Sequence, residues 1–436
     1  MNSNTAFSNN LQWTAGQKIA FRFFFIFFTL QILTESFMGN WFGYTLFIWK
    51  LGEKIFVRPC LWLNMHIFHF KYIPQTWTTF SGALHTIRDT VYLLLTCSVC
   101  VLWTIFDKKR TNYNKLLYWF SQCLVIALSC IGFSYGIVKI FPIQMMSPSF
   151  IGLHTPVGGL SPFDLLWTTF GYGKPYQIFS GFFELSGAIL ILFNRTRVAG
   201  LLIIVSVMLN VVILNYTYQI GVLILSFYIL LVTLFLLAPY ARQLVSFFFA
   251  KQPVVLSQNE YVPDKNFKTK LFKIMAMLLI SSSFIFNIRS AYNLYTKTES
   301  INNSRRYSLV KNYVVNNDTL KLIENDTVCW RIWSERVTGG KRFVAIATMK
   351  PGVYKTYLIE QDSSKHSLIL HPFNQNDTTS LNFSYTDIDE INWCLDGTIK
   401  QKNIKVELQK INPDTTVNLL KTKRTIITFD DESDRE

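Results

Sequence analysis

The sequence predicts an all-α multi-pass membrane bundle of about seven transmembrane helices, followed by a small all-β soluble domain. Half of the 436 residues are hydrophobic and 38 are Phe, whereas only 16% are charged, a balance that soluble proteins rarely show. The apolar residues cluster before about residue 290, in runs long enough to cross a bilayer. The remaining sequence has ordinary polarity and short segments typical of strands.

Seven apolar stretches are candidate membrane spans. They cover residues 18–36, 89–106, 116–140, 176–193, 198–216, 220–239 and 271–289. Each approaches the length of about 20 residues that a helix needs to cross the hydrocarbon core. A polar stretch precedes the first span and no small-residue cleavage site follows it, so we interpret this span as an anchor and not as a signal peptide.

Basic residues set the predicted orientation. Residues 1–289 carry 22 Lys and Arg against 8 Asp and Glu, whereas residues 290–436 carry 20 against 19. The excess gathers in alternate loops, including Asp107–Arg110 and Asn194–Arg197, which places the N-terminus in the cytoplasm and the C-terminal domain outside, in the periplasm of a bacterial inner membrane. The soluble part has no basic stripe with interleaved aromatics, so nucleic acid is not an expected partner.

The last third of the chain predicts an antiparallel β-sandwich or barrel. Turn sequences such as Gly339-Gly340 and Asp396-Gly397 separate its short apolar runs. The candidate strands are 306–315, 327–335, 342–348, 353–360, 366–370, 381–386, 391–395 and 403–409. Upstream, five prolines over 141–175 predict an ordered but irregular external cap between two spans.

These patterns divide the chain into seven parts. They are a cytoplasmic N-terminus (1–17), the first two spans with an external interfacial loop (18–115), a segment with four spans (116–245), a cytoplasmic linker (246–270), the last span (271–289), the periplasmic β-sandwich-like domain (300–425) and an acidic tail (426–436).

Glu184 is the main candidate site residue. It lies near the middle of the fourth span, between Gly181 and Gly187. A charge at membrane depth is costly, which makes it a functional candidate that must be protonated or paired with a cation. Lys139 is one candidate partner, and Arg88 and Asp89 are others. Two interpretations stay open: a polar clamp that holds the bundle together, or a site that binds a quinone, a lipid or a proton.

We expect other polar residues of the spans to make structural contacts. Asn210 and Asn215 in the fifth span are expected to donate hydrogen bonds between helices. Asn210 is also grouped with the polar site around Glu184. Gln31 and Glu35 lie toward the outer end of the first span, and we expect a structural role for them.

Cysteines and histidines give weaker signals. Cys329 and Cys394 are the cysteines of the soluble domain and form a disulfide or remain free thiols, depending on the compartment. His66 and His69 have one-turn spacing, but a metal site requires more ligands, so no metal site is predicted.

The stretch from about residue 103 to 245 resembles DoxX-like membrane proteins, in particular a longer type from Bacteroidetes with an extra soluble C-terminal region. The residues that carry the resemblance are Trp103–Arg110, Asn112-Tyr113, Tyr135–Gln144, Ser161-Pro162, Trp167-Thr168, Gly171-Tyr172, Gly181–Gly187, Arg195–Arg197, Gly200, Met208, Asn210-Val211, Leu214-Asn215 and Leu237–Pro239. The chain departs from that pattern at Gln219–Leu223, where the group has acidic and basic residues.

The resemblance implies a four-helix core between residues 116 and 239. Some DoxX-type proteins are linked to quinone-coupled redox complexes. We therefore consider two hypotheses for the function. The first is a non-catalytic envelope component that displays its β domain to a periplasmic or membrane protein partner. The alternative is a quinone-linked oxidoreductase subunit, with Glu184 as the proton or quinone ligand.

Overall fold

The computed structural model describes residues 12–34, 55–70, 82–250, 253–254, 261, 263–264, 266–373 and 379–412. It divides into two compact units. The first unit comprises Met1–Gln144 and Gly173–Asn293, and the second comprises Met145–Tyr172 and Leu294–Glu436. Glu35 lies outside the described residues.

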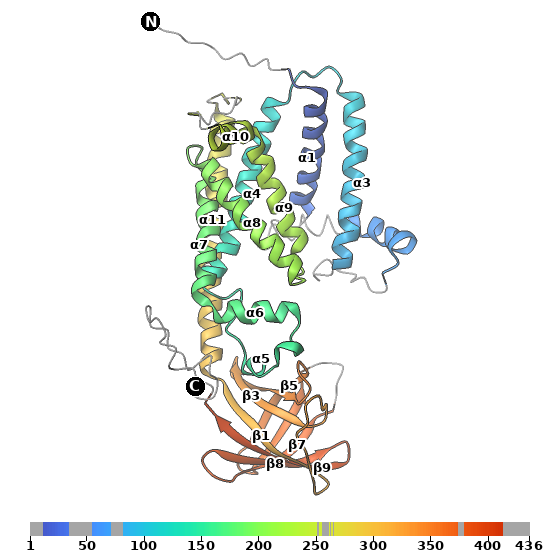
Figure 1. Cartoon of the computed structure of the whole chain (residues 1–436), viewed down its shortest axis with the longest axis vertical. Helices are drawn as coiled ribbons and strands as arrows, with labels where there is room; N and C mark the ends of the chain where they lie inside the picture. The colour runs from blue at the N-terminus through green and yellow to red at the C-terminus, as the bar shows by residue number, and fades with distance from the viewer. Residues whose placement is uncertain are drawn as a thin grey trace. The chain divides into compact units, whose positions relative to one another are not determined.

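The first unit is helical. Its elements are α1 (Ala15–Thr34), a short helix that ends in the π-helical turn η1 (Asn64–Phe68), α3 (Gly82–Phe106), α4 (Asn114–Ile140), α7 (Lys174–Leu190), α8 (Arg197–Thr217), α9 (Leu223–Leu237), η3 (Ala238–Tyr240), α10 (Ala241–Phe249) and the first part of α11 (Phe267–Asn303) (Figure 1). Within the described residues, each of the seven predicted spans falls on a helix.

Five helical stretches are long and apolar enough to cross a membrane. They are Thr86–Phe106, Asn114–Ile140, Arg197–Thr217, Leu223–Phe249 and Phe267–Asn303. The chain is therefore a multi-pass membrane protein by helix length and composition. The other two predicted spans correspond to α1, with 20 residues, and α7, with 17. A total of about seven spans stays a prediction.

Four helices form a bundle in the first unit. Helix α4 packs along α7, α7 along α8 and α8 along α9, while α9 also contacts α4. Helix α1 pairs with α3, and its Phe28 ring lies 5.5 Å from Phe235 of α9. Leu124, Leu128 and Leu201 are fully buried between the helices. The apolar faces thus meet inside the unit and leave other apolar side chains to face the lipid.

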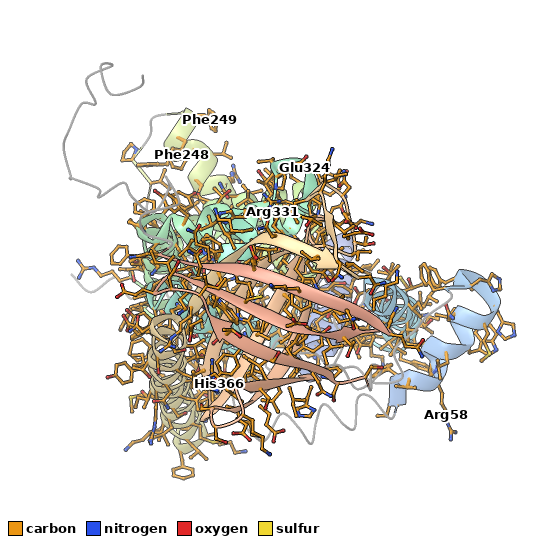
Figure 2. The ribbon with its side chains drawn as sticks, turned by 90° about the horizontal axis from the view of Figure 1, so that it is seen from below. Arg58, Phe248, Phe249, Glu324, Arg331 and His366 are labelled. Atoms are coloured by element: carbon orange, nitrogen blue, oxygen red, sulfur yellow. The ribbon has the colours of Figure 1, made fainter. Side chains whose placement is uncertain are left out.

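Helix α10 carries an apolar face that the first unit does not cover. It follows α9 directly after the turn that contains Pro239. Its side chains Val245, Phe247, Phe248 and Phe249 are all exposed, and Figure 2 shows Phe248 and Phe249 at the edge of the molecule. An apolar face on a short helix next to a membrane-length helix is typical of a segment at the bilayer interface.

The second unit contains a closed β-barrel. Its strands are β1 (Arg306–Val315), β2 (Asp318–Leu320), β3 (Trp330–Thr338), β4 (Lys341–Thr348), β5 (Tyr354–Asp362), β6 (Ser367–Pro372), β7 (Leu381–Asp387), β8 (Asn392–Ile399) and β9 (Lys402–Ile411) (Figure 1). Neighbours from β3 to β9 pair in chain order, and β1 pairs with both β3 and β9. Eight strands therefore form a ring, with β2 as a hairpin extension of β1.

Ring closure corrects the sandwich-like description of this domain. A sandwich has two sheets with free edges, whereas pairing of β1 with β9 from Tyr307 to Val315 leaves the ring without an open edge. The two-residue turn between β3 and β4 is the predicted Gly339-Gly340, and both glycines have positive φ. This conformation suits a tight hairpin turn, which glycine adopts without steric cost.

Large side chains fill the barrel interior. Residues alternate between the inner and outer faces of each strand, and the inner positions include Trp330, Trp333, Tyr357, Phe383 and Trp393. The Trp333 and Trp393 rings meet at 5.4 Å. Barrels of eight strands have an interior that side chains can fill. This one is a packed core and not a container.

The predicted irregular cap contains short helices. These are α5 (Phe150–Leu153), η2 (Val157–Gly159) and α6 (Pro162–Tyr172), which belong to the same unit as the barrel. Phe150 is buried against Ile332 of β3 and Ala347 of β4, and its ring lies 4.8 Å from that of Tyr307. The segment thus covers part of the outer wall of the barrel.

Candidate functional site

Glu184 of α7 forms a buried ion pair with Lys139 of α4. Lys139 Nζ donates to Glu184 Oε1, and the two side chains are 9% and 3% exposed. A buried carboxylate without a cation would carry a large desolvation cost, which the nearby ammonium offsets. Of the candidate partners that the sequence offers, the structure places Lys139 next to Glu184.

Small residues bring α4 and α7 close together at this point. A Cβ atom on Gly181 would lie 2.7 Å from the carbonyl oxygen of Gly136 and 2.7 Å from Lys139 Cβ. A Cβ on Gly132 would lie 2.5 Å from Ala188 Cβ. Ser129 Oγ donates a hydrogen bond of 2.9 Å to the Ala188 carbonyl. The pair therefore sits in a small-residue interface of the kind that membrane helices use for tight packing.

The second carboxylate oxygen of Glu184 has a different environment. Oε2 is buried and has no hydrogen-bond partner among the described residues. Glu184 also lines a cavity of about 30 Å³ together with Gly132, Tyr135 and Met208. A cavity of this size has room for about one water molecule, whereas sites for organic ligands typically occupy about 300–1,000 Å³. The residues therefore do not fit a quinone ring at Glu184.

Arg88 and Asp89 form a separate pair on α3. Arg88 Nη2 lies 3.0 Å from Asp89 Oδ1, and the Arg88 guanidinium also lies over the Tyr92 ring at 5.7 Å. The Tyr228 hydroxyl of α9 lies beside Asp89 and beside Gln31 of α1. The structure thus assembles polar residues from three helices around the Arg88–Asp89 pair.

Asn210 does not take part in either cluster. It is exposed on α8, so the expectation of an interhelical hydrogen bond at Asn210 is wrong. Asn215 has the predicted role, because its Nδ2 donates to Ser226 Oγ of α9 at 3.0 Å in a buried contact. Five residues along an α-helix correspond to a rotation of about 140°, so the two side chains point in different directions.

Sequence reasoning missed a polar cluster around Arg22. This buried side chain of α1 donates to the Tyr113 hydroxyl, to Thr104 Oγ1 and to the Asp107 carbonyl, each at 2.9 Å. Tyr113 in turn donates to Asp107 Oδ2 at 2.7 Å, and this bond is the main reason that the pKa of Asp107 is lowered. The only sequence signal was a basic residue inside an apolar span, which served to assign topology.

Cys329 and Cys394 are free, buried thiols in the structure. Cys329 belongs to the interior core of the barrel. Cys394 lies between Trp393 and Leu395, which face the interior, so alternation along β8 directs its thiol to the outer face. The two thiols lie on opposite faces of the barrel wall, which excludes the disulfide in this fold.

Comparisons with known proteins find similarity over part of the chain. No protein-family model and no solved structure matches the chain. An uncharacterized protein, YwoB of Bacillus subtilis (strain 168), is 37% identical over 86 residues, which are 20% of this chain and 56% of that protein. The chain thus spans about half the length of this curated relative, and the match identifies similarity in part of the chain without assigning a family.

Proposed function

We propose that this protein is a non-catalytic component of a cell-envelope assembly. Its DoxX-like helical unit anchors it in the inner membrane through about seven spans, and its barrel is displayed in the periplasm, where it binds a protein partner. Basic residues gather in alternate loops, among them Asp107–Arg110 and Asn194–Arg197. The positive-inside rule, which assigns such loops to the cytoplasm, supports this sidedness.

The proposal of a protein partner rests on an aromatic patch on the outer wall of the barrel. Phe343, Tyr354, Leu358 and Phe373 occupy outward positions on β4, β5 and the end of β6. Phe343 pairs with Leu358 across the strands, and the Phe343 and Phe373 rings meet at 5.9 Å. Tyr354 and Phe373 are 57% and 66% exposed. Exposed aromatic residues that cluster on one face are typical of protein–protein interfaces.

The filled interior supports an outer binding surface. Trp330, Trp333 and Phe383 occupy the space that a carrier barrel would offer to a ligand. At one rim, Arg342 donates to Glu335 Oε2 at 2.7 Å, and Trp333 Nε1 donates to Glu335 Oε1 at 2.7 Å. Binding by the barrel therefore depends on its outer wall.

Site-specific photo-crosslinking in intact cells tests the partner. A photoreactive phenylalanine analogue at Tyr354 is expected to give one discrete crosslinked adduct, whose second protein is identified by mass spectrometry. A photoreactive residue placed in that partner should give the same adduct. The yield of the adduct should fall when the substitution Phe373→Ser is combined with the probe at Tyr354. The same probe at Ile391, which is 51% exposed before β8 and away from the patch, is the control. No adduct at Tyr354, or an equal adduct at Ile391, contradicts the proposal.

Protease protection tests the sidedness. Protease added to intact spheroplasts should remove the barrel and leave the helical unit protected. Protection of the barrel in intact spheroplasts, followed by digestion after lysis, would place it in the cytoplasm and refute the periplasmic display.

A second candidate function rests on the unpartnered Oε2 of Glu184. Glu184 also lines a cavity with room for about one water molecule, which favours a proton site over a quinone site. The alternative role of a quinone-linked subunit then requires Glu184 to take up or release a proton. Glu184→Gln should abolish quinone-dependent electron flow in membranes that contain the protein, with Asn210→Leu as the control. Unchanged flow in Glu184→Gln would remove this candidate.

A further inference from the structure

Exposed basic side chains gather at one end of the helical unit. They come from the α3–α4 linker, the start of α4, the turn between α7 and α8, α10 and the start of α11. We call this set the basic end: Lys108, Lys109, Arg110, Lys115, Arg195, Arg242, Lys268, Lys270 and Lys273. The described residues of these segments contain two carboxylates, Asp107 and Asp264. Nine cations against two acids give this end a positive potential that attracts anions.

Helix packing brings the start of α4 level with α10. Helices α4 and α9 run in opposite directions (Figure 1), and the rings of Phe120 and Phe235 lie 6.1 Å apart. Helix α4 begins six residues before Phe120, and α10 begins six residues after Phe235. Lys115 in the first turn of α4 and Arg242 in the first turn of α10 therefore lie at the same end of the bundle.

The start of α11 reaches the same level. The rings of Trp119 and Phe272 lie 4.8 Å apart and those of Phe133 and Phe284 lie 5.2 Å apart, so α4 and α11 run in the same direction. Each helix begins five residues before the first of these contacts. The three lysines that α11 contributes to the basic end therefore lie beside the first turns of α4.

The fold neutralises few of these cations. Arg110 Nε lies 3.8 Å from Asp107 Oδ2. No other member of the basic end forms an ion pair within the described part of the chain. Lys115 Nζ lies 6.0 Å from the centroid of the Tyr261 ring, which leaves its charge uncompensated. Most of the positive charge is thus available to an anionic partner.

Helix α10 adds an apolar face to the basic end. Figure 1 shows α10 turned across the direction of α9, and Figure 2 shows Phe248 and Phe249 at the edge of the molecule. Val245, Phe248 and Phe249 are 58%, 60% and 83% exposed, and their spacing places them on one side of the helix. Arg242 lies three positions before Val245, which places its charge beside this face.

This arrangement matches the layers of a membrane surface. An amphipathic helix with basic and aromatic residues lies in the plane of the bilayer, with its apolar face about 5–10 Å into the boundary between head groups and acyl chains. The long side chain of Arg242 can extend to the phosphates while the aromatic rings lie among the chains. Because α10 directly follows a membrane-length apolar stretch, its face starts at the depth of this boundary.

The opposite end of the helical unit has fewer exposed cations. Among the described residues they are Arg58, Lys174 and Arg289. Arg58 precedes residues that pack on the start of α3, Lys174 begins α7, and Arg289 lies 22 residues after the start of α11. The positive charge is therefore concentrated at the end that also carries the exposed aromatic face.

We propose that the basic end and the exposed face of α10 together bind anionic phospholipids of the adjacent leaflet. The Lys and Arg side chains contact the head-group phosphates, and Phe248 and Phe249 insert among the acyl chains. The proposal depends on the membrane spans and not on the side of the membrane that the barrel occupies.

The first experiment measures lipid retention by the full chain in nanodiscs. Both leaflets contain equal amounts of phosphatidylglycerol and phosphatidylcholine with the same acyl chains. Native mass spectrometry gives the ratio of the two lipids that stay bound, and wild type should retain phosphatidylglycerol in preference. Arg242→Gln/Lys268→Gln/Lys270→Gln should lower this preference by at least about tenfold, since each cation near an anionic surface changes binding by about fivefold.

A matched variant separates a local site from net charge. Arg58→Gln/Lys174→Gln/Arg289→Gln removes the same number of exposed cations from the opposite end and should retain the preference of wild type. All six side chains are exposed, so both proteins are expected to fold. If the two triple variants show the same preference, whether unchanged or lowered, the proposal is refuted.

The second experiment tests the face of α10. The nanodiscs contain phosphatidylglycerol with a photoreactive diazirine in its acyl chain, and peptide mass spectrometry locates the adducts. The segment Ala241–Phe249 should carry adducts, and Phe248→Ser/Phe249→Ser should remove most of them. If a second copy of the chain covers this face, α10 will carry no adducts and native mass spectrometry will show a dimer that the double variant separates. That result would overturn the lipid contact of α10.

Discussion

Lys139 and Glu184 form their ion pair next to a contact between two glycines. Each residue lies three positions after a glycine of its own helix, Gly136 in α4 and Gly181 in α7, and a Cβ on Gly181 would lie 2.7 Å from the Gly136 carbonyl. The glycines let the helices approach, and this approach buries the two charges together. Polar pairing and close packing at this interface are therefore coupled.

Loss of one member of this ion pair should destabilise the protein more than loss of both. Lys139→Met leaves Glu184 buried without its cation, and we expect a loss of about 3 kcal/mol in the free energy of unfolding. The double variant Lys139→Met/Glu184→Leu should recover most of this loss, because no buried charge remains. Unfolding in mixed micelles compares wild type, Lys139→Met, Glu184→Leu and the double variant. If the effects of the single variants simply add, the coupling is absent.

Gly181→Ala should weaken the contact between α4 and α7. Its new methyl group would lie 2.7 Å from a backbone oxygen that cannot move without shifting α4, and such overpacking costs about 1–3 kcal/mol. Gly221→Ala is the matched control, since no atom lies within 4 Å of its added Cβ. Melting temperatures of the two variants provide the comparison, and equal values would contradict the close packing.

Tyr113→Phe should destabilise the end of α1. The change removes the acceptor of the buried Arg22 Nε while it preserves the aromatic ring, and an unsatisfied buried donor costs about 1–3 kcal/mol. Tyr216, which is 75% exposed on α8, gives the matched control Tyr216→Phe. The free energy of unfolding in mixed micelles is the measurement. A Tyr113→Phe protein as stable as the control would show that the Arg22 cluster does not stabilise α1.

Cys329 and Cys394 should resist thiol reagents in the folded protein. Burial, followed by the nearby Asp326 carboxylate, raises the pKa of Cys329 to about 12, and burial also raises the pKa of Cys394. The reactive thiolate is therefore scarce near neutral pH. A charged maleimide should label neither cysteine until denaturant is added, as followed by peptide mass spectrometry. A Cys329–Cys394 peptide in a non-reduced digest would overturn the assignment of free thiols.

Asp326 should make the barrel acid-sensitive. A hydrogen bond from the Cys329 thiol, followed by one from the Val328 amide, lowers the pKa of Asp326 in the fold. A carboxyl group with a lowered folded-state pKa adds stability above its unfolded pKa, about 3.9, and this stability is lost as the pH falls through the folded value. The melting temperature should thus decrease once the pH is lowered below about 4. Asp326→Asn should reduce the slope of melting temperature against pH in that range. An identical slope in Asp326→Asn would exclude this contribution.

The strands of the barrel were largely predictable from local sequence. The predicted strand 306–315 corresponds to β1, and 403–409 lies inside β9 (Lys402–Ile411). Alternation of apolar and polar residues and the Gly339-Gly340 turn are local signals. Pairing of β1 with β9 joins residues 89 to 104 positions apart in the chain. No local pattern indicates whether the strands form a closed ring or two stacked sheets.

The candidate site was only partly predictable for a similar reason. Glu184 was visible because a carboxylate in an apolar span is rare. Its pairing with Lys139 depends on the rotation and approach of α4 and α7, and the bond from Arg22 to Thr104 depends on the level at which α1 packs against α3. Asn210 and Asn215 look alike in sequence, yet only Asn215 faces another helix.

By itself, the sequence determined that apolar runs become membrane-length helices and that the polar third becomes strands, because hydrophobic length and alternation act locally. Only the tertiary structure decided which buried charges meet, which thiols stay apart and which polar atoms remain without partners. These outcomes depend on distances of a few ångströms between helices or strands that are far apart in the chain.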